Sequence, residues 1–178
     1  GTLHNLRHRS TEELEAELLR HAPETPMSLV LPCLYSELEG DALTGIVDKL
    51  AKVPYLEEII IGLDAADREQ FERARDFFSK LPQRHSILWN DGPRLLEIDR
   101  RLTTENLSPL ERGKGRNVWY CLGYFLASAR SKVVALHDCD ILTYERDMPA
   151  RLFYPLVHPD MDYVFCKGYY YRAAQGRL

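Results

Sequence analysis

The sequence lacks the features that mark several common classes of protein. No apolar run approaches the roughly 18 residues of a membrane-spanning helix, and the first residues lack the apolar core of a secretion signal. The basic residues are scattered and the net charge is −4, which argues against a nucleic-acid partner. The four cysteines are isolated, without the CxxC pairs typical of zinc or redox motifs. We therefore expect a cytoplasmic protein with no membrane span and no nucleic-acid ligand.

The familiar phosphate-binding loops are also missing. There is no GxxxxGK[ST] motif, and Gly113-Lys114-Gly115 is too short for the Rossmann GxGxxG motif. The chain also has no glycine-rich loop after its first apolar run, which argues against a sugar nucleotidyltransferase. A nucleotide would have to be bound by other residues.

What the sequence does contain is a regular alternation of short apolar runs and helical patterns. A hydrophobic content of 45% over 178 residues supports one domain with a real core. Ser10 with Glu13 and Asp67 with Gln70 have the spacing of capping boxes, and each pair predicts the start of a helix. Five strands are expected, at Met27–Leu31, Glu58–Leu63, Ser86–Trp89, Lys132–Leu136 and Tyr163–Cys166.

This alternation predicts an α/β fold with a Rossmann-like, doubly wound and mostly parallel sheet flanked by helices. Residues 1–26 are expected to form an N-terminal helical extension, and residues 27–178 to form a nucleotide-binding domain. The polar stretch from Asn90 to Arg112 predicts at most one helix inside a long loop. Doubly wound sheets bind ligands at the carboxyl ends of their strands, so candidate site residues belong there.

Asp138-Cys139-Asp140 at the end of the fourth expected strand is the sharpest of these candidates. In extended backbone, residues i and i+2 point the same way, so Asp138 and Asp140 can face one site. Two adjacent carboxylates repel each other unless a cation or a donor lies between them, and oxygen ligands suit Mg²⁺ or Mn²⁺. The alternative is an ordinary turn, where Asp is common.

Two more segments follow the same logic. Gly113-Lys114-Gly115 precedes a helical pattern, and a helix N-terminus with a lysine favours a phosphate; the alternative is a solvated basic loop. The first strand ends near Pro32, Leu34 and Glu37, and the second ends at Asp64, in the same layer. Asp67 is expected to be a helix cap, whereas for Asp64 both a ligand role and a structural role are open.

Taken together, these residues resemble the glucosyl-3-phosphoglycerate synthases and mannosylglycerate synthases, which are retaining glycosyltransferases of the GT-A fold. The matching order is Leu31-Pro32 with Glu37, then a strand closing in Asp64, then Gly113-Lys114-Gly115, then Asp138-Cys139-Asp140. The segment Val164 to Tyr170 resembles the strand that follows the metal site in that family. The resemblance covers residues 27–172.

The resemblance implies an enzyme that moves a hexose from a nucleotide sugar (UDP-glucose or GDP-mannose) to a small hydroxy acid such as 3-phosphoglycerate or glycerate, with retention. It implies donor contacts from one set of residues: Pro32, Leu34, Glu37, Asp64, Lys114 and Asp138. It also implies an Mg²⁺ or Mn²⁺ ion on Asp140 and Asp138. No catalytic residue is assigned.

In that family, an acceptor-binding segment and a further metal-binding histidine lie at positions after the one that corresponds to Leu178. The residues that match the family here are therefore expected to form the donor half of the site. Two alternatives stay open, an inverting glycosyltransferase and a nucleotide-binding fragment without activity. A homodimer is left open as well.

Overall fold

Four parallel strands form the centre of the computed structural model, which describes residues 9–109 and 111–169. The strands are β1 (Met27–Leu34), β2 (Leu56–Asp64), β3 (His85–Trp89) and β4 (Val133–Leu136), and their order in the sheet is β3-β2-β1-β4. β1 lies inside the sheet and pairs with both β2 and β4. The chain therefore winds outward from β1 to β3 and then crosses back to form β4 on the other side of β1. The predicted α/β fold is confirmed.

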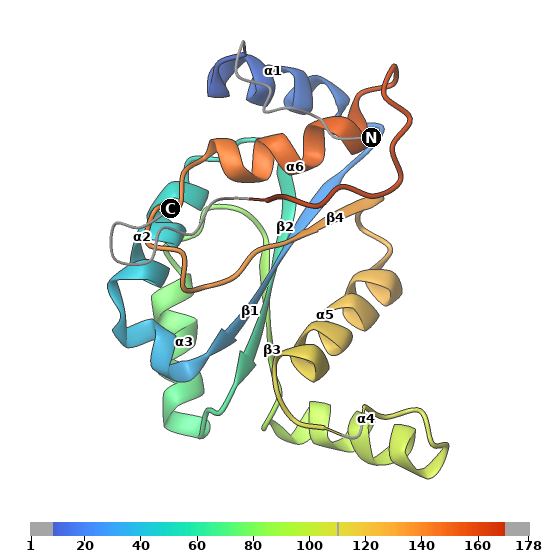
Figure 1. The fold of residues 1–178 in the computed structure, drawn as a ribbon. Coiled ribbons are helices and arrows are strands. Elements are labelled where there is room, and N and C mark those ends of the chain that lie inside the picture. The colour runs from blue at the N-terminus through green and yellow to red at the C-terminus, as the bar shows by residue number, and fades with distance from the viewer. Residues whose placement is uncertain (1–8, 110, 170–178) are drawn as a thin grey trace.

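Helices cover both faces of this sheet, with α5 on one face and α2, α3 and α6 on the other (Figure 1). They are α1 (Thr11–His21), η1 (a 3-10 helix, Tyr35–Glu39), α2 (Asp41–Leu50), α3 (Arg68–Phe78), α4 (Pro93–Thr104), α5 (Lys114–Ser128) and α6 (Asp147–Val157). Among the helices in the described part of the chain, none is long and apolar enough to cross a membrane.

Alternate residues of the central strands point into two separate cores, as a sheet covered on both faces requires. Leu29 and Ile61 belong to the larger core, beneath α1, α2, α3 and α6. Val30 and Ile60 point the other way and pack against Cys121 and Phe125 of α5. The doubly wound arrangement therefore follows from central strands that present apolar residues to both faces.

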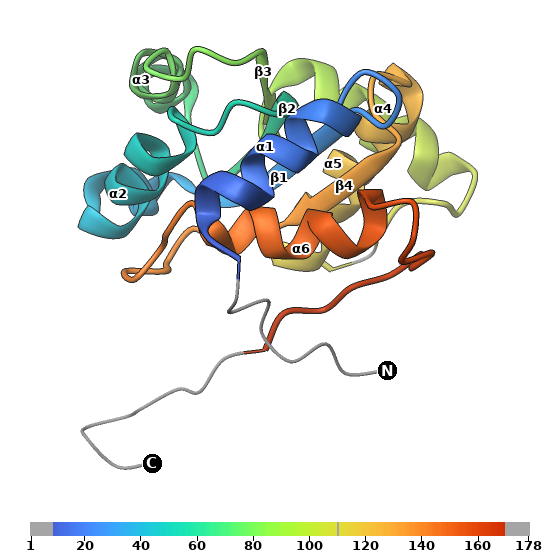
Figure 2. The same cartoon turned by 90° about the horizontal axis from the view of Figure 1, so that it is seen from above.

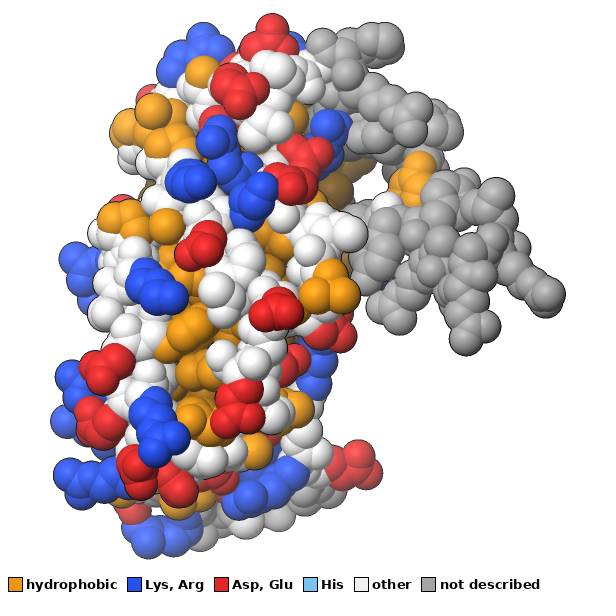
Figure 3. Space-filling model, turned by 90° about the vertical axis from the view of Figure 1, so that its left-hand side faces the viewer, with side chains coloured by type: hydrophobic (Ala, Val, Ile, Leu, Met, Phe, Trp, Pro, Cys, Tyr) orange, Lys and Arg blue, Asp and Glu red, His pale blue; other side chains and the backbone are white. Residues whose placement is uncertain are grey.

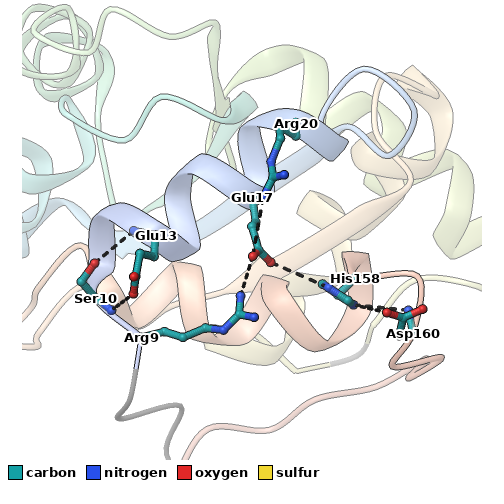
Figure 4. A network of polar contacts seen from close by, with 7 residues as sticks. All are labelled: Arg9, Ser10, Glu13, Glu17, Arg20, His158 and Asp160. Atoms are coloured by element: carbon teal, nitrogen blue, oxygen red, sulfur yellow. Dashed lines mark hydrogen bonds and ion pairs between the residues drawn. The ribbon is translucent and has the colours of Figure 1, made fainter.

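α1 lies beside α6 and shares the larger core (Figure 2). The predicted capping box is present: Ser10 accepts from the Glu13 amide, and Glu13 accepts from the Ser10 amide. Glu17 then joins α1 to Arg9 at 2.6 Å and lies 3.8 Å from His158, at the end of α6 (Figure 4). The proposed division of the chain at residue 26 stays a prediction.

The regions between the strands agree with most of the sequence-based expectations. Asp67 and Gln70 cap α3 reciprocally. One helix, α4, occupies the long polar stretch and begins with Pro93 at its first turn, where a missing N–H costs nothing.

The expected fifth strand at Tyr163–Cys166 is wrong. These residues have no strand partner in the described structure, and the side chains of Val164 and Phe165 are 96% and 76% exposed. An apolar run becomes a strand only by pairing, and the apolar pattern alone does not supply a partner.

Candidate functional site at the strand ends

The carboxyl end of β1 is shaped by Pro32. Val30 accepts a hydrogen bond from the His137 amide at 3.1 Å, so alternate residues of β1 face β4. Pro32 is the next residue on that side and has no N–H to donate, so the β1–β4 ladder stops there. Beyond this point, Leu34 is about half exposed, and its amide donates to Glu37 Oε2 at 2.7 Å. The carboxylate of Glu37 is therefore held at the strand end by the backbone.

Residues after β2 and β3 interlock beside this point. Asp64 accepts from the Ala65 amide, and Ala65 has a positive φ of 55°, which turns the chain sharply. The Ala66 amide donates to Asp91, and Trp89 Nε1 donates to the Ala66 carbonyl at 2.7 Å. Asp91 also lies 3.5 Å from Arg112. Asp91 is not among the candidates predicted from the sequence, because it lies in a polar stretch that resembles a loop; its position two residues after a strand is the signal that could have identified it.

α5 brings Lys114 to the site because the helix lies unusually close to β2. A Cβ atom built on Gly62 would lie 1.8 Å from Asn117 Oδ1, so only glycine allows this approach. Asn117 is buried and donates to the Gly62 carbonyl at 2.8 Å. At the start of the helix, Gly113 has a φ of 134°, and no side chain caps the first turn. Lys114 then forms an ion pair with Asp138.

The segment after β4 differs in detail from the expected extended chain. β4 ends at Leu136, and Cys139 and Asp140 lie in a turn. The burial nevertheless alternates, with His137 and Cys139 buried, Asp138 partly exposed and Asp140 exposed. Both carboxylates therefore stay on the accessible side, although the hydrogen-bonded ladder has stopped.

The electrostatics of this turn are dominated by burial of the inward side chains. Burial lowers the pKa of His137 to about 4, against a smaller opposing effect of the Asp138 charge. The pKa of the Cys139 thiol is raised by its contact with Cys33 and by burial, while Lys114 opposes the rise. His137 is thus neutral near pH 7 and packs against the Tyr144 ring, so its role is in packing.

The structure brings together several of the residues singled out from the sequence. Lys114 contacts Asp138, its charge acts on Cys139, and Cys139 lies against Cys33 and Glu37. The ends of β1 and β4 and the start of α5 therefore meet. Pro32 is buried beneath this surface, and Asp64 lies at the end of the adjacent strand β2.

The carboxylate oxygens at the turn after β4 suit a hard divalent ion. Asp140 makes no side-chain hydrogen bond or ion pair with another described residue, and its carboxylate is exposed. Asp138 has Lys114 as a counter-charge, and its side chain is 37% exposed. Two accessible carboxylates suit Mg²⁺ or Mn²⁺, which fill the remaining positions with water and phosphate oxygens. The roles of the individual residues stay predictions.

Two surface cavities lie away from the strand ends. One, of about 430 Å³, lies between α1, α2 and the start of α6, and is lined by Thr11, Glu12, Lys49, Lys52, Glu145, Arg146 and Asp147. The other, of about 370 Å³, is lined by α3 and β3.

Lysine, arginine and acidic side chains are intermixed over the face shown in Figure 3. That face shows no broad positive surface.

Comparison with known proteins gives a consistent result. No protein-family model matches the sequence. The chain is 45% identical over 171 residues to a glucosyl-3-phosphoglycerate synthase of Persephonella marina, covering 96% of this chain and 42% of that protein. It is 38% identical over 149 residues to the protein of the same name from Methanococcoides burtonii, covering 83% of this chain and 36% of that protein.

A solved structure shows the same fold. The chain matches the Mycobacterium tuberculosis glucosyl-3-phosphoglycerate synthase in complex with Mn²⁺, UDP and glucosyl-3-phosphoglycerate, with a TM-score of 0.54 and 20% identity. The match covers 88% of this chain and 47% of that one. The GT-A type fold predicted from the sequence is therefore confirmed. Over nearly its whole length the chain is a homologue of glucosyl-3-phosphoglycerate synthases, and it spans about two fifths of the length of the curated relatives it matches.

Proposed function

We propose that this chain forms the donor-binding part of a retaining glucosyltransferase that moves glucose from UDP-glucose to 3-phosphoglycerate. The observation that carries the proposal is the 45% identity over 96% of the chain, which includes every strand end described above. UDP-glucose and phosphoglyceric acid are bound together with Mn²⁺ in a structure of the Mycobacterium tuberculosis protein, which supports this donor and this acceptor class over GDP-mannose and glycerate.

In this proposal, residues at the ends of β1 and β2 and at the start of α5 bind different parts of the donor. Leu34 offers an exposed apolar surface to the base, and Glu37, fixed by the Leu34 amide, accepts from ribose hydroxyls. Asp64 lies at the next strand end, on the same side. The uncapped first turn of α5 directs free N–H groups toward the diphosphate, and Lys114 adds a full positive charge.

Asp138 and Asp140 would hold the Mg²⁺ or Mn²⁺ ion, whose charge stabilises the departing diphosphate. Lys114 forms an ion pair with Asp138, which places its ammonium group beside the carboxylates that would hold the ion. A lysine at this position would also be within reach of a diphosphate bound to the same ion.

The proposal is tested by ligand-dependent thermal stability, because a ligand that binds only the native state raises stability by RT ln(1 + [L]/Kd). The chain is heated with UDP-glucose, GDP-mannose or ADP-glucose, each with Mn²⁺ and with EDTA. We expect the largest rise in Tm with UDP-glucose and Mn²⁺. Equal shifts for all three donors, or shifts that EDTA leaves unchanged, would contradict the proposal.

Activity of the chain is a separate question. Positioning of an acceptor is worth roughly 7–11 kcal/mol of barrier, and none of the residues proposed to bind the donor positions it. For these residues alone we therefore expect weak donor binding and little or no transfer to 3-phosphoglycerate. Turnover of about one per second or faster would show that these residues already contain an acceptor site.

A further inference from the structure

Two thiols and one carboxylate converge just beneath the strand ends. Cys33 comes from the end of β1, Glu37 from η1, and Cys139 from the turn after β4. One ligand atom from each lies within 4.8 Å of the other two. The cysteines are only 1% and 2% exposed, whereas Glu37 is partly exposed and gives the cluster a route to solvent.

We propose that Cys33, Glu37 and Cys139 bind a thiophilic divalent ion of the Zn²⁺ class, at a site separate from the carboxylates of Asp138 and Asp140. Sulfur ligands select Zn²⁺ over Mg²⁺ and Mn²⁺, which prefer oxygen. Three protein ligands leave the fourth tetrahedral position to water. Although Cys139 lies between the two aspartates in sequence, it points inward and they point outward, so the two donor sets lie on opposite sides of one turn.

The geometry needs only small adjustments. With Zn–S bonds of about 2.3 Å, two sulfur ligands of a tetrahedral ion lie roughly 3.8 Å apart, which is within the 4.8 Å limit of the cluster. The Cys33 thiol now donates to the Leu34 carbonyl at 3.2 Å and would give up this bond. Glu37 can keep the Leu34 amide on Oε2 and bind the ion through Oε1, and the second acceptor site of Oε2 stays open to a ribose hydroxyl. Both thiol protons pass to solvent as the ion binds.

Charge balance is compatible with an ion at this place. Without an ion the cysteines are neutral thiols, and the Cys33 thiol donates to the Leu34 carbonyl. With a divalent ion bound, two thiolates and a carboxylate carry three negative charges, of which the ion cancels two. Lys114, which pairs with Asp138, is close enough for its charge to act on Cys139 as well. The backbone elements that supply the ligands are fixed by pairing of β1 with β2 and of β1 with β4.

The test is a titration of the whole chain with Co²⁺, in the presence of a phosphine reductant and without nucleotide. Cobalt is a spectroscopic substitute for zinc, and a sulfur ligand gives a thiolate-to-Co²⁺ charge-transfer band in the near ultraviolet. We expect this band to saturate at one ion per chain, to disappear when Zn²⁺ is added, and to persist in excess Mn²⁺. Because no nucleotide is present, the result does not depend on the proposed function.

Matched variants locate the site. Cys33→Ser and Cys139→Ser should each weaken Co²⁺ binding at least about tenfold. Glu37→Gln should also weaken Co²⁺ binding, and because Glu37 is partly exposed, this substitution does not put folding at risk. Cys166→Ser, which changes a cysteine outside the cluster, and Asp140→Asn should leave the band unchanged. Thermal melts of every variant check the fold. Absence of the band in the wild-type chain, or its survival in both Cys33→Ser and Glu37→Gln, would overturn the proposal.

Discussion

The contact between Gly62 and Asn117 makes a demanding prediction, because a single methyl group should move a whole helix. In Gly62→Ala the new Cβ would start 1.8 Å from Asn117 Oδ1 and 2.6 Å from the Cys121 sulfur. An ordinary contact of 3.4 Å requires α5 to withdraw by roughly 1.6 Å, or the Asn117 side chain to rotate and lose its hydrogen bond. Overpacking of this kind costs about 1–3 kcal/mol. Loss of the buried bond from Asn117 to the Gly62 carbonyl costs about 1–3 kcal/mol more.

The free energy of unfolding should therefore fall by about 2–6 kcal/mol, which for a domain of this size lowers Tm by roughly 5–20 °C. Urea denaturation followed by circular dichroism measures the first quantity, and calorimetry measures the second. Because α5 carries Lys114 away from Asp138, affinity for a nucleotide diphosphate should fall as well.

Two further variants make this reasoning refutable. Gly45→Ala is the control, because a Cβ at this exposed position of α2 meets nothing within 4 Å, and the change should stabilise the helix by about 0.5–1 kcal/mol. Asn117→Ala removes the nearest clashing atom, so the double variant with Gly62→Ala should lose less stability than the sum of the two single losses. Strict additivity, or a Gly62→Ala midpoint equal to that of the wild type, would show that α5 does not lie where the structure puts it.

Three other predictions concern the strand ends. Lys114→Gln should weaken binding of UDP about tenfold in isothermal titration, in line with loss of one charge-assisted contact that is partly exposed, and a wild-type affinity in the variant would refute this role. Asp140→Ala should abolish the difference in nucleotide affinity between Mn²⁺ and EDTA while leaving the melting curve unchanged, since the side chain has no partner among the described residues. His137 should make the metal-free protein lose stability as the pH falls. Its folded pKa of about 4 lies below the ordinary value of 6.5, so the unfolded chain binds more protons between these values and up to about 3 kcal/mol is lost across them. In His137→Phe this loss should be absent from urea melts at pH 7 and pH 5, and an equal loss in both proteins would contradict the assignment.

The sequence was sufficient for most of the fold because its signals are local. The two capping boxes at Ser10 and Asp67 and the apolar runs of β1 and β2 predicted these elements within a few residues. The end of β4 could be placed because an apolar run meets a polar one at His137. These patterns report helix starts and burial, which depend on neighbouring residues.

The parts that could not be predicted depend on contacts between distant segments. The segment at Val164 has the composition of a strand, yet pairing needs a partner that composition does not identify. Three features could be predicted only with the register of the sheet known: the burial of Pro32, the role of Asp91 and the pairing of Lys114 with Asp138. The cluster of Cys33, Glu37 and Cys139 combines two cysteines that are far apart in sequence with a glutamate, and only the fold brings them together.

The strand order has a consequence for how the site comes into existence during folding. Met27 of β1 pairs with Leu56 of β2 on one side and with Val133 of β4 on the other. Contacts distant in sequence require closure of a long loop, which is entropically costly and slows folding. Since the residues proposed to bind ligand are divided between β1 and the segment after β4, a chain in which only β1, β2 and β3 have assembled lacks part of the proposed site. Nucleotide and metal can then bind only after the slowest pairing has formed, so they should slow unfolding of this protein without accelerating its folding.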